Sequence, residues 1–336
     1  MSQLLQFTDK GIYCEAGDFY IDPHKPVNRA IITHAHSDHA YRGHQVYLAH
    51  RQSVPVMRQR LGADINVHSL EYNEKIIHNG VTVSLHPAGH IIGSSQVRVE
   101  LNGEVWVASG DYKTEDDGIS TPFEPVKCNT FISESTFGLP VYQWKAQQRI
   151  FDEIESWWKR NQERGMASVL LCYALGKAQR ILCGIDLSTG PIYAHGAIEN
   201  VNEVLRKNGS PVPEVKRITA ENKREDFRNA LILATAAVQN TSWLAKLKPY
   251  SIGFASGWMQ IRGNKRRGAH DIGFALSDHA DWNGLNNAVK ATGAERVFVT
   301  HGYTYQFARW LREKGLDAQE VTTSYQGEVI VDDEVG

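Results

Sequence analysis

The chain has 336 residues and a formal net charge of −2, and 42% of its residues are hydrophobic and 22% charged. This balance gives enough apolar material for one large or two smaller globular domains. It excludes a generally basic surface, so a nucleic-acid site would need local positive charge or bound metal. The four cysteines form no CxxC pair, which argues against a zinc ribbon or a disulfide framework. Residues 1–11 lack the features of a secretory signal and no segment is long enough to span a bilayer, so we expect a cytoplasmic protein without a membrane partner.

The first part of the chain is predicted to be rich in β-strands. The segment GIYCEAGDFYID, residues 11–22, alternates around a glycine-containing turn as a hairpin does. In QVRVELNGEVWVAS, residues 96–109, Asn102 and Gly103 separate two alternating runs. Asn-Gly is the preferred pair for a type I′ hairpin turn.

Metal-type side chains follow three apolar runs in this first part. RAIIT, residues 29–33, leads directly into HAHSDH, residues 34–39; the run from Val81 leads to His90, and the run from Glu104 leads to Asp111. Loops at strand ends, held by a rigid sheet, commonly carry the chemistry of a layered fold. Metal-type side chains at the ends of three predicted strands indicate a cluster of ligands in the folded protein. They do not fit a single exposed histidine-rich loop.

The pattern changes after about Phe137 to alternating helices and strands. Residues 142–165 have helical spacing, 167–174 indicate a strand, and this order repeats through residues 176–209, as in a parallel α/β sheet. Ligand-type residues return beyond this region, at His279 and at His301. The α/β region is therefore interpreted as an insert, followed by a helix that stops at Gly293.

Imidazole and carboxylate donors together suit Zn²⁺, Mn²⁺ or iron. His34 and His36 alternate and can face one ion with His90, whereas Asp38 and His39 can serve a second ion with His301. Asp111 can bridge through its two oxygens. Two ions about 3.5–4 Å apart can activate water and stabilise both the attacking and the leaving oxygen of a phosphoryl displacement, and a bound water has a pKa near 7.

These residues carry a family resemblance. Asp22, the HAHSDH segment, His90 and Asp111 resemble, in order and setting, the motifs of the metallo-β-lactamase fold. FISESTF with Glu134, YALGKAQRIL, SDHAD with His279 and VTHG with His301 resemble the further motifs of the β-CASP nucleases. Residues 276–318 look most like the compact bacterial exonucleases associated with ATP-dependent DNA ligases.

The resemblance implies a fold, a site and a function. The implied fold is an α/β metallo-β-lactamase αββα sandwich, residues 1–138 and 266–336, with an inserted β-CASP-type α/β domain, residues 139–265. One metal would be held by His34, His36, His90 and Asp111, and the other by Asp38, His39, Asp111 and His301. Asp22 would orient a ligating histidine, Glu134 would support the site, and His279 would be the general acid. The implied activity is that of a DNA exonuclease that acts in the 5′ to 3′ direction in DNA repair. It would use two divalent ions, with Zn²⁺ as the expected metal and Mn²⁺ as the alternative. Its partners would be an ATP-dependent DNA ligase and other repair proteins.

Each weaker assignment has an ordinary structural alternative. Asp22 precedes Pro23 and can be a turn residue, Glu134 can cap a loop, and His279 can satisfy a backbone group at a helix start. Lys177 begins a predicted helix and can bind phosphate with the amides there, or be solvated. The run 262–267, with Lys265, Arg266 and Arg267, either is a solvated loop or binds the phosphate backbone of a nucleic-acid strand.

Three other functions compete with a DNA exonuclease. RNA processing is favoured by His301, because the RNA-processing branch of the resembled family has a ligating histidine there and the eukaryotic DNA-repair branch typically has an apolar residue. A small-ester, lactone or thioester hydrolase would use the same metal set, but a long insert fits a strand-binding cleft better. An inactive scaffold subunit is the third alternative, and the presence of every expected ligand argues against it.

Overall fold

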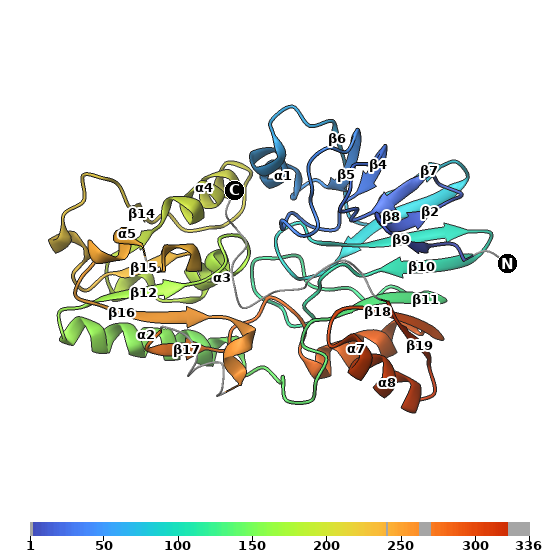
Figure 1. Cartoon of the computed structure of the whole chain (residues 1–336). Coiled ribbons are helices and arrows are strands. Elements are labelled where there is room, and N and C mark those ends of the chain that lie inside the picture. The colour runs from blue at the N-terminus through green and yellow to red at the C-terminus, as the bar shows by residue number, and fades with distance from the viewer. Residues whose placement is uncertain (1–2, 240, 262–269, 322–336) are drawn as a thin grey trace. The chain divides into compact units, whose positions relative to one another are not determined.

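The computed structural model describes residues 3–239, 241–261 and 270–321, which form two compact units (Figure 1). Of these described residues, the first unit contains those up to Tyr142 and from His279 to Val321, and the second contains those between Gln143 and Asp278. The sequence placed these boundaries at 138/139 and 265/266, and the division into separate domains stays a prediction. No helix in the described ranges is long and apolar enough to cross a membrane.

The first unit contains two sheets. The six-stranded sheet runs in the order β1 (Gln6–Thr8), β2 (Gly11–Cys14), β3 (Phe19–Ile21), β4 (Arg29–Ile31), β5 (Val46–His50), β6 (Val67–Leu70). The seven-stranded sheet runs in the order β19 (Asp317–Glu320), β18 (Arg296–Gly302), β11 (Thr130–Ser135), β10 (Glu104–Ala108), β9 (Ser95–Leu101), β8 (Val81–Pro87), β7 (Lys75–His78). The strands from β8 to β10 are antiparallel, and β10, β11, β18 and β19 are parallel.

One apolar core joins the two sheets. It contains Ile21 and Ile31 from the first sheet and Val83, Val99 and Trp106 from the second, all at most 4% exposed. Along β3 and β9 the side chains on the face toward this core alternate with more exposed neighbours, as the period of two requires, whereas β11 and much of β8 and β10 are buried on both faces. Burial of this face fixes the strand registers, because a slip by one residue would turn the apolar side chains outward.

Helices cover the other face of the seven-stranded sheet. They are α7 (Trp282–Thr292) and α8 (Thr304–Glu313), which lie against β18 and β19 in Figure 1 and share a second core with that sheet. Asp281 caps α7 by accepting the amide hydrogen of Gly284 at 2.7 Å, and Gly293 ends the helix in the left-handed conformation. A third helix, α1 (Val54–Leu61), connects the parallel strands β5 and β6. The expected α/β sandwich with outer helices is confirmed.

The two expected hairpins are also present. β2 and β3 pair antiparallel, as do β9 and β10. Asn102 and Gly103 both have positive φ, 51° and 83°, as a type I′ turn requires.

The second unit is a parallel sheet with helices. Its strands run in the order β14 (Lys216–Arg217), β13 (Ile192–Ala194), β15 (Leu231–Ala234), β12 (Ala167–Leu171), β16 (Tyr250–Ala255), β17 (Ile272–Phe274). Every neighbouring pair is parallel. Among its described residues, the α-helices are α2 (Gln147–Glu163), α3 (Lys177–Gly184), α4 (Gly196–Lys207) and α5 (Ser242–Ala245), and short 3₁₀ turns lie at Leu187–Thr189, Arg224–Phe227, Ala236–Val238 and Gly257–Gln260.

The longest helix of this unit explains how its sheet is covered. α2 buries Ile150, Ile154, Trp157 and Trp158 along one side, the spacing expected for a single apolar face. Trp157 contacts Phe274 with ring centroids 5.6 Å apart. The strand-then-helix order predicted from the sequence is therefore confirmed as a parallel α/β unit.

Candidate metal centre

The candidate site lies at strand ends of the first unit. β4 ends two residues before Thr33 and the HAHSDH segment, β8 leads to His90, and β10 leads to Asp111. Gly110 lets the Asp111 loop approach the histidine segment, because a Cβ at Gly110 would lie 2.7 Å from Thr33 Cβ. Two segments about 75 residues apart in the sequence thus meet at one place.

Asp111 is the centre of this site. Its Oδ2 lies 3.4 Å from His39 Nε2, 3.7 Å from His34 Nε2 and 3.9 Å from His90 Nε2. All four residues are at most 6% exposed. A single buried carboxylate therefore faces three imidazole nitrogens.

The hydrogen bonds of Asp22 and Thr33 determine which nitrogens of two rings face the centre. Asp22 Oδ2 lies 2.8 Å from His39 Nδ1 and accepts the Thr33 hydroxyl at 2.6 Å. A carboxylate only accepts, so His39 Nδ1 carries a hydrogen. Because the Thr33 hydroxyl proton goes to Asp22, its oxygen accepts from His34 Nδ1 at 3.1 Å. In the neutral rings of His34 and His39, Nε2 is then the nitrogen with a lone pair directed at Asp111.

These donors fit a metal ion. His34 Nε2 is buried and has no hydrogen-bond partner among the described residues, a costly state for a polar atom unless an ion satisfies it. His90 Nε2 lies 3.1 Å from His36 Nδ1, close to the roughly 3.3 Å expected between two nitrogens bound to one tetrahedral zinc ion. Ligand atoms within 4.8 Å of one another define three overlapping groups: His34, His36 and His90; His34, His39 and Asp111; His90, Asp111 and His279.

Glu134 holds His279 at the edge of this cluster. The Glu134 carboxylate accepts the amide hydrogens of Tyr112 at 2.9 Å and Thr136 at 3.2 Å. Its Oε1 also lies 2.9 Å from His279 Nδ1, so that ring nitrogen donates. The His279 ring centroid is 4.6 Å from that of His90. His279 is therefore oriented through one nitrogen and lies beside the cluster.

His301 and Asp38 lie next to the three groups and belong to none of them. The His301 ring stacks on that of His39 at 5.5 Å between centroids, and Asp38 Oδ2 is 3.8 Å from His39 Nε2. His301 has a φ of 55°, an uncommon backbone conformation that is frequent at functional sites. Ser135, at a register shift between β11 and β18, donates to the His301 carbonyl at 2.5 Å. This contact helps to hold His301 in that conformation.

Opposing effects set the pKa values in the cluster. Burial, with the neighbouring rings of His39 and His90, lowers the pKa of His34 well below its usual value. Burial acts on His39 in the same direction, but nearby carboxylates, Asp111 first, raise its pKa well above the usual value. Burial opposes ionisation of Asp111, yet His39 and His279 bring its pKa well below the usual value. Asp111 is thus a carboxylate at neutral pH, the form in which it binds cations.

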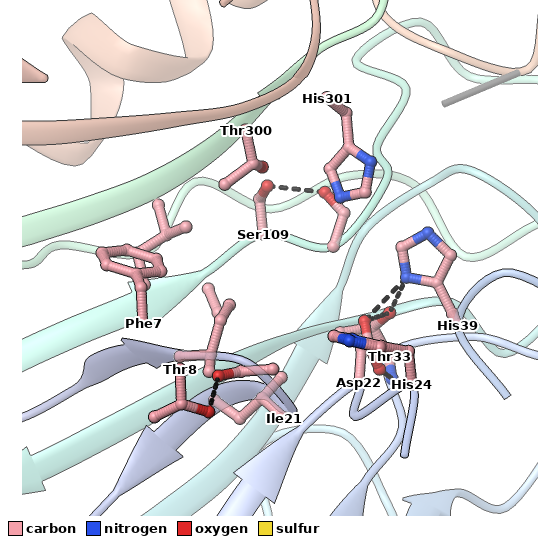
Figure 2. A pocket seen from close by; sticks show the side chains of 15 residues that line it. Phe7, Thr8, Ile21, Asp22, His24, Thr33, His39, Ser109, Thr300 and His301 are labelled. Carbon is pink, nitrogen blue, oxygen red and sulfur yellow. Dashed lines mark hydrogen bonds and ion pairs between the residues drawn. The ribbon is translucent and has the colours of Figure 1, made fainter. Parts of the chain in front are cut away.

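A cavity of about 50 Å³ borders this cluster. Figure 2 shows His39 and His301 at one end of it and Phe7 at the other. Ile12, Ile21 and Ile132 line it as well. The apolar wall lowers the local dielectric constant, which strengthens electrostatic interactions at the His39 side of the cluster.

Of the predicted phosphate-binding residues, the structure describes Lys177. Lys177 is fully buried in the second unit, with its Nζ 3.4 Å from Asp278 Oδ2. This ion pair gives the Lys177 charge a protein partner, and it is not the solvent-facing lysine that a phosphate contact needs. Lys265, Arg266 and Arg267 lie outside the described residues.

Thr33 is a site residue that the sequence interpretation missed. Its hydroxyl contacts both Asp22 and His34. A hydroxyl directly before the first histidine of the HAHSDH segment is a local signal, but only the fold brings Asp22 to it.

No family model matches the chain. A probable DNA ligase of Opitutus terrae is 29% identical over 95% of this chain and 31% of its own length. An RNase J-like protein of Methanocaldococcus jannaschii is 25% identical over 89% of this chain and 87% of its own length. Cleavage and polyadenylation specificity factor subunit 3 of Dictyostelium discoideum is 29% identical over 36% of this chain and 16% of its own length. The chain thus spans under a third of two of these three relatives.

Solved structures share the fold. A protein of unknown function from Enterococcus faecalis V583 superposes with a TM-score of 0.61 at 11% identity, covering 88% of this chain and 79% of that one. In its two-sheet sandwich, the cluster at its strand ends and its sequence relatives, the chain resembles the metallo-β-lactamase-fold nucleases of the β-CASP type.

Proposed function

We propose that the protein is a metal-dependent phosphodiesterase that hydrolyses nucleic acid. The observation that carries this proposal is the buried Asp111 carboxylate, which faces the Nε2 atoms of three histidines at 3.4–3.9 Å. The relatives support nucleic acid as the substrate, since they are named as a probable DNA ligase, an RNase J-like protein and a cleavage and polyadenylation specificity factor subunit.

The proposed metal ligands form two overlapping sets. One ion would be held by His34, His36, His90 and Asp111, and the other by Asp38, His39, Asp111 and His301. Bound divalent ions, with Zn²⁺ as the expected metal and Mn²⁺ as the alternative, would supply a water of lowered pKa and neutralise phosphate charge. The chain's own residues prepare this site: Asp22 and Thr33 fix the His34 and His39 tautomers, and the low pKa of Asp111 keeps its charge in place.

His279 is proposed as the general acid. Glu134 accepts from His279 Nδ1, so a protonated ring has Nε2–H available for the leaving sugar oxygen. The backbone amides of Tyr112 and Thr136 hold the Glu134 carboxylate in place. A positioned acid of this kind contributes about 10²–10⁴ in rate.

DNA is the proposed substrate, and exonucleolytic hydrolysis from the 5′ end in DNA repair is the proposed action. The support is that 95% of this chain is similar to 31% of a probable DNA ligase. A nuclease-type region within a ligase polypeptide would place trimming of an end beside its sealing. We therefore propose an ATP-dependent DNA ligase as the partner.

RNA processing is the second candidate function. His301 lies beside His39, as the resemblance to RNA-processing nucleases implies, and two relatives are named for RNA chemistry. The position of His301 is equally explained by the ligand demand of a second ion, because without it that ion would have only Asp38, His39 and Asp111. Metal ligands do not read the sugar, which is distinguished by contacts at the 2′ position.

A time course on matched DNA and RNA strands tests these proposals. The strands are labelled at either end and carry a 5′-phosphate or a 5′-hydroxyl, with Zn²⁺ or Mn²⁺ supplied to metal-stripped protein. We expect single-nucleotide products from the 5′ end of DNA. Faster cleavage of RNA, or internal cuts as first products, would favour the RNA-processing function instead.

A further inference from the structure

Helix α3 of the second unit carries two buried cations. Lys177 is 0% exposed and Arg180 is 2% exposed, although long charged side chains are rarely buried without a specific partner. They lie one turn apart on the helix, so their side chains lie on one face of it.

Both cations bind the residues directly before His279. Lys177 Nζ lies 3.4 Å from Asp278 Oδ2, and Arg180 Nη1 lies 3.3 Å from Asp278 Oδ1. Arg180 Nη1 also donates to the Ser277 carbonyl. Arg180 itself is oriented by Gln147, whose side-chain oxygen accepts from Arg180 Nε at 2.8 Å. The backbone and the side chain of this short segment are thus both held by α3.

The residues after Asp278 are held by different contacts. Ala280 donates its amide hydrogen to the Tyr112 carbonyl at 2.7 Å, and Asp281 caps α7. His279 therefore lies between two anchored segments, one bound by α3 through Asp278 and the other bound within the first unit. A residue anchored on both sides has little freedom to change its backbone angles, which suits a side chain that must meet a reacting atom.

Stability alone is a weak reason for this arrangement. Two buried cations with one carboxylate cost desolvation free energy, and replacing buried ion pairs with apolar side chains is often neutral or stabilising. The contacts instead fix two residues whose chain neighbour is the proposed general acid.

We propose that Lys177 and Arg180 are positioning residues that set the geometry of His279 through Ser277 and Asp278. This inference rests on the proposed function of His279. It replaces the phosphate-binding role that the sequence suggested for Lys177.

The first test measures hydrogen exchange and needs no activity. Lys177→Met should raise the exchange rate of the amide hydrogens in the peptide covering 276–280. The separate variant Lys177→Arg should exchange as slowly as the wild type, because it keeps the charge. The matched control is Glu199→Gln, which breaks another ion pair of the same unit, that of the buried Glu199 with the partly buried Arg206, without touching residues 277–278. If Lys177→Met and Arg180→Met both exchange as the wild type does at 276–280, the proposal is overturned, whether or not the protein cleaves nucleic acid.

The second test is a double-mutant cycle on hydrolysis. Lys177→Met should lower kcat by roughly 10²-fold with KM and metal content unchanged. In a His279→Gln background the same change should have almost no further effect, because the two residues act as one unit. Equal losses in both backgrounds would show a merely structural role and would overturn the proposal. If the wild-type protein hydrolyses no phosphodiester, the proposed function fails, and the exchange measurement still decides whether α3 holds the segment.

Discussion

Two clusters of buried polar side chains differ in how their charges are matched. Around Asp111, imidazoles gather on one carboxylate, and the His34 Nε2 atom has no hydrogen-bond partner among the residues described. Around Asp278, two cations meet the carboxylate and backbone of one segment. Lone pairs that converge on one place favour a bound cation, whereas complementary charges favour a fixed geometry. Both clusters are buried, so burial alone does not tell them apart. The difference lies in the charges: those around Asp111 suit a bound ion, and those around Asp278 hold a segment of the chain in place.

The largest expected effect comes from Asp111→Asn. Asparagine keeps the shape but removes the charge that both proposed ions share. We expect loss of metal at both positions, and a rate loss greater than the roughly 10²–10³-fold typical of deleting one electrostatic donor. Metal analysis and a hydrolysis assay check this together. A variant that keeps two ions per chain, or near-native turnover, would rule out Asp111 as the bridge.

His279→Gln should have the next largest effect. Loss of a general acid costs about 10²–10⁴ in rate, and the metal content should stay at its wild-type value. His68→Gln, an exposed histidine on β6, is the matched control and should leave the rate unchanged. Loss of metal from the His279 variant would instead make His279 a ligand, as its proximity to His90 and Asp111 also permits.

Thr33→Val should weaken metal binding more modestly. The change removes the hydroxyl that links Asp22 to His34 and leaves the branched shape. Residues that orient a metal-binding histidine typically contribute 10–100-fold to metal affinity. A competition titration with a chelator measures this, and Thr33→Ser should retain most of the affinity. A loss of affinity in the serine variant with full affinity in the valine variant would mean that the methyl group, and not the hydroxyl, matters.

The basic run is expected to affect binding and not the chemical step. Replacing Lys265, Arg266 and Arg267 by alanine should reduce the slope of log affinity against log salt by about 0.7 for each lost contact to a single strand. Affinity measured over a range of salt concentrations gives this slope. An unchanged slope would mean that these residues are a solvated loop.

The smallest predicted effect is on stability, through a histidine outside the cluster. Burial lowers the pKa of His50 to about 4, and its ring stacks on Tyr72 with centroids 3.6 Å apart. The unfolded chain protonates this ring below pH 6.5, whereas the folded chain does so only near pH 4. The stabilising contribution is therefore complete above pH 6.5 and is lost as the pH falls toward 4, by roughly 1 kcal/mol at pH 5.5.

Urea unfolding at pH 7.5 and 5.5 measures this contribution. His50→Gln cannot titrate, so its free energy of unfolding should fall less between the two pH values than that of the wild type. The same fall in both proteins would show that other groups carry the pH dependence.

Local sequence patterns predicted much of the fold. The Asn102–Gly103 turn, the end of α7 at Gly293 and the strand-helix order of the second unit depend on near neighbours in the chain, so the sequence contains them. Likewise, five of the residues named as ligands from spacing and resemblance fall in the three overlapping groups, namely His34, His36, His39, His90 and Asp111, and Asp38 and His301 lie beside His39. Their assignment to two ions stays a prediction.

Long-range contacts escaped the sequence interpretation. Thr33 acquires its role only when the fold brings Asp22 to it. Lys177 looks like a phosphate contact in isolation, because its partner Asp278 lies about 100 residues further along the chain. A single sequence contains no local signal for such pairs.

The central claim is that the cluster around Asp111 holds two divalent ions that the hydrolytic activity requires. Calorimetric titration of metal-stripped protein with Zn²⁺, followed at each step by hydrolysis of end-labelled DNA, tests it most directly. The account predicts saturation at two ions per chain, with activity rising as the second site fills. Hydrolysis that persists in metal-stripped protein with excess chelator would contradict it. A titration in which the wild-type cluster binds no zinc would contradict it as well.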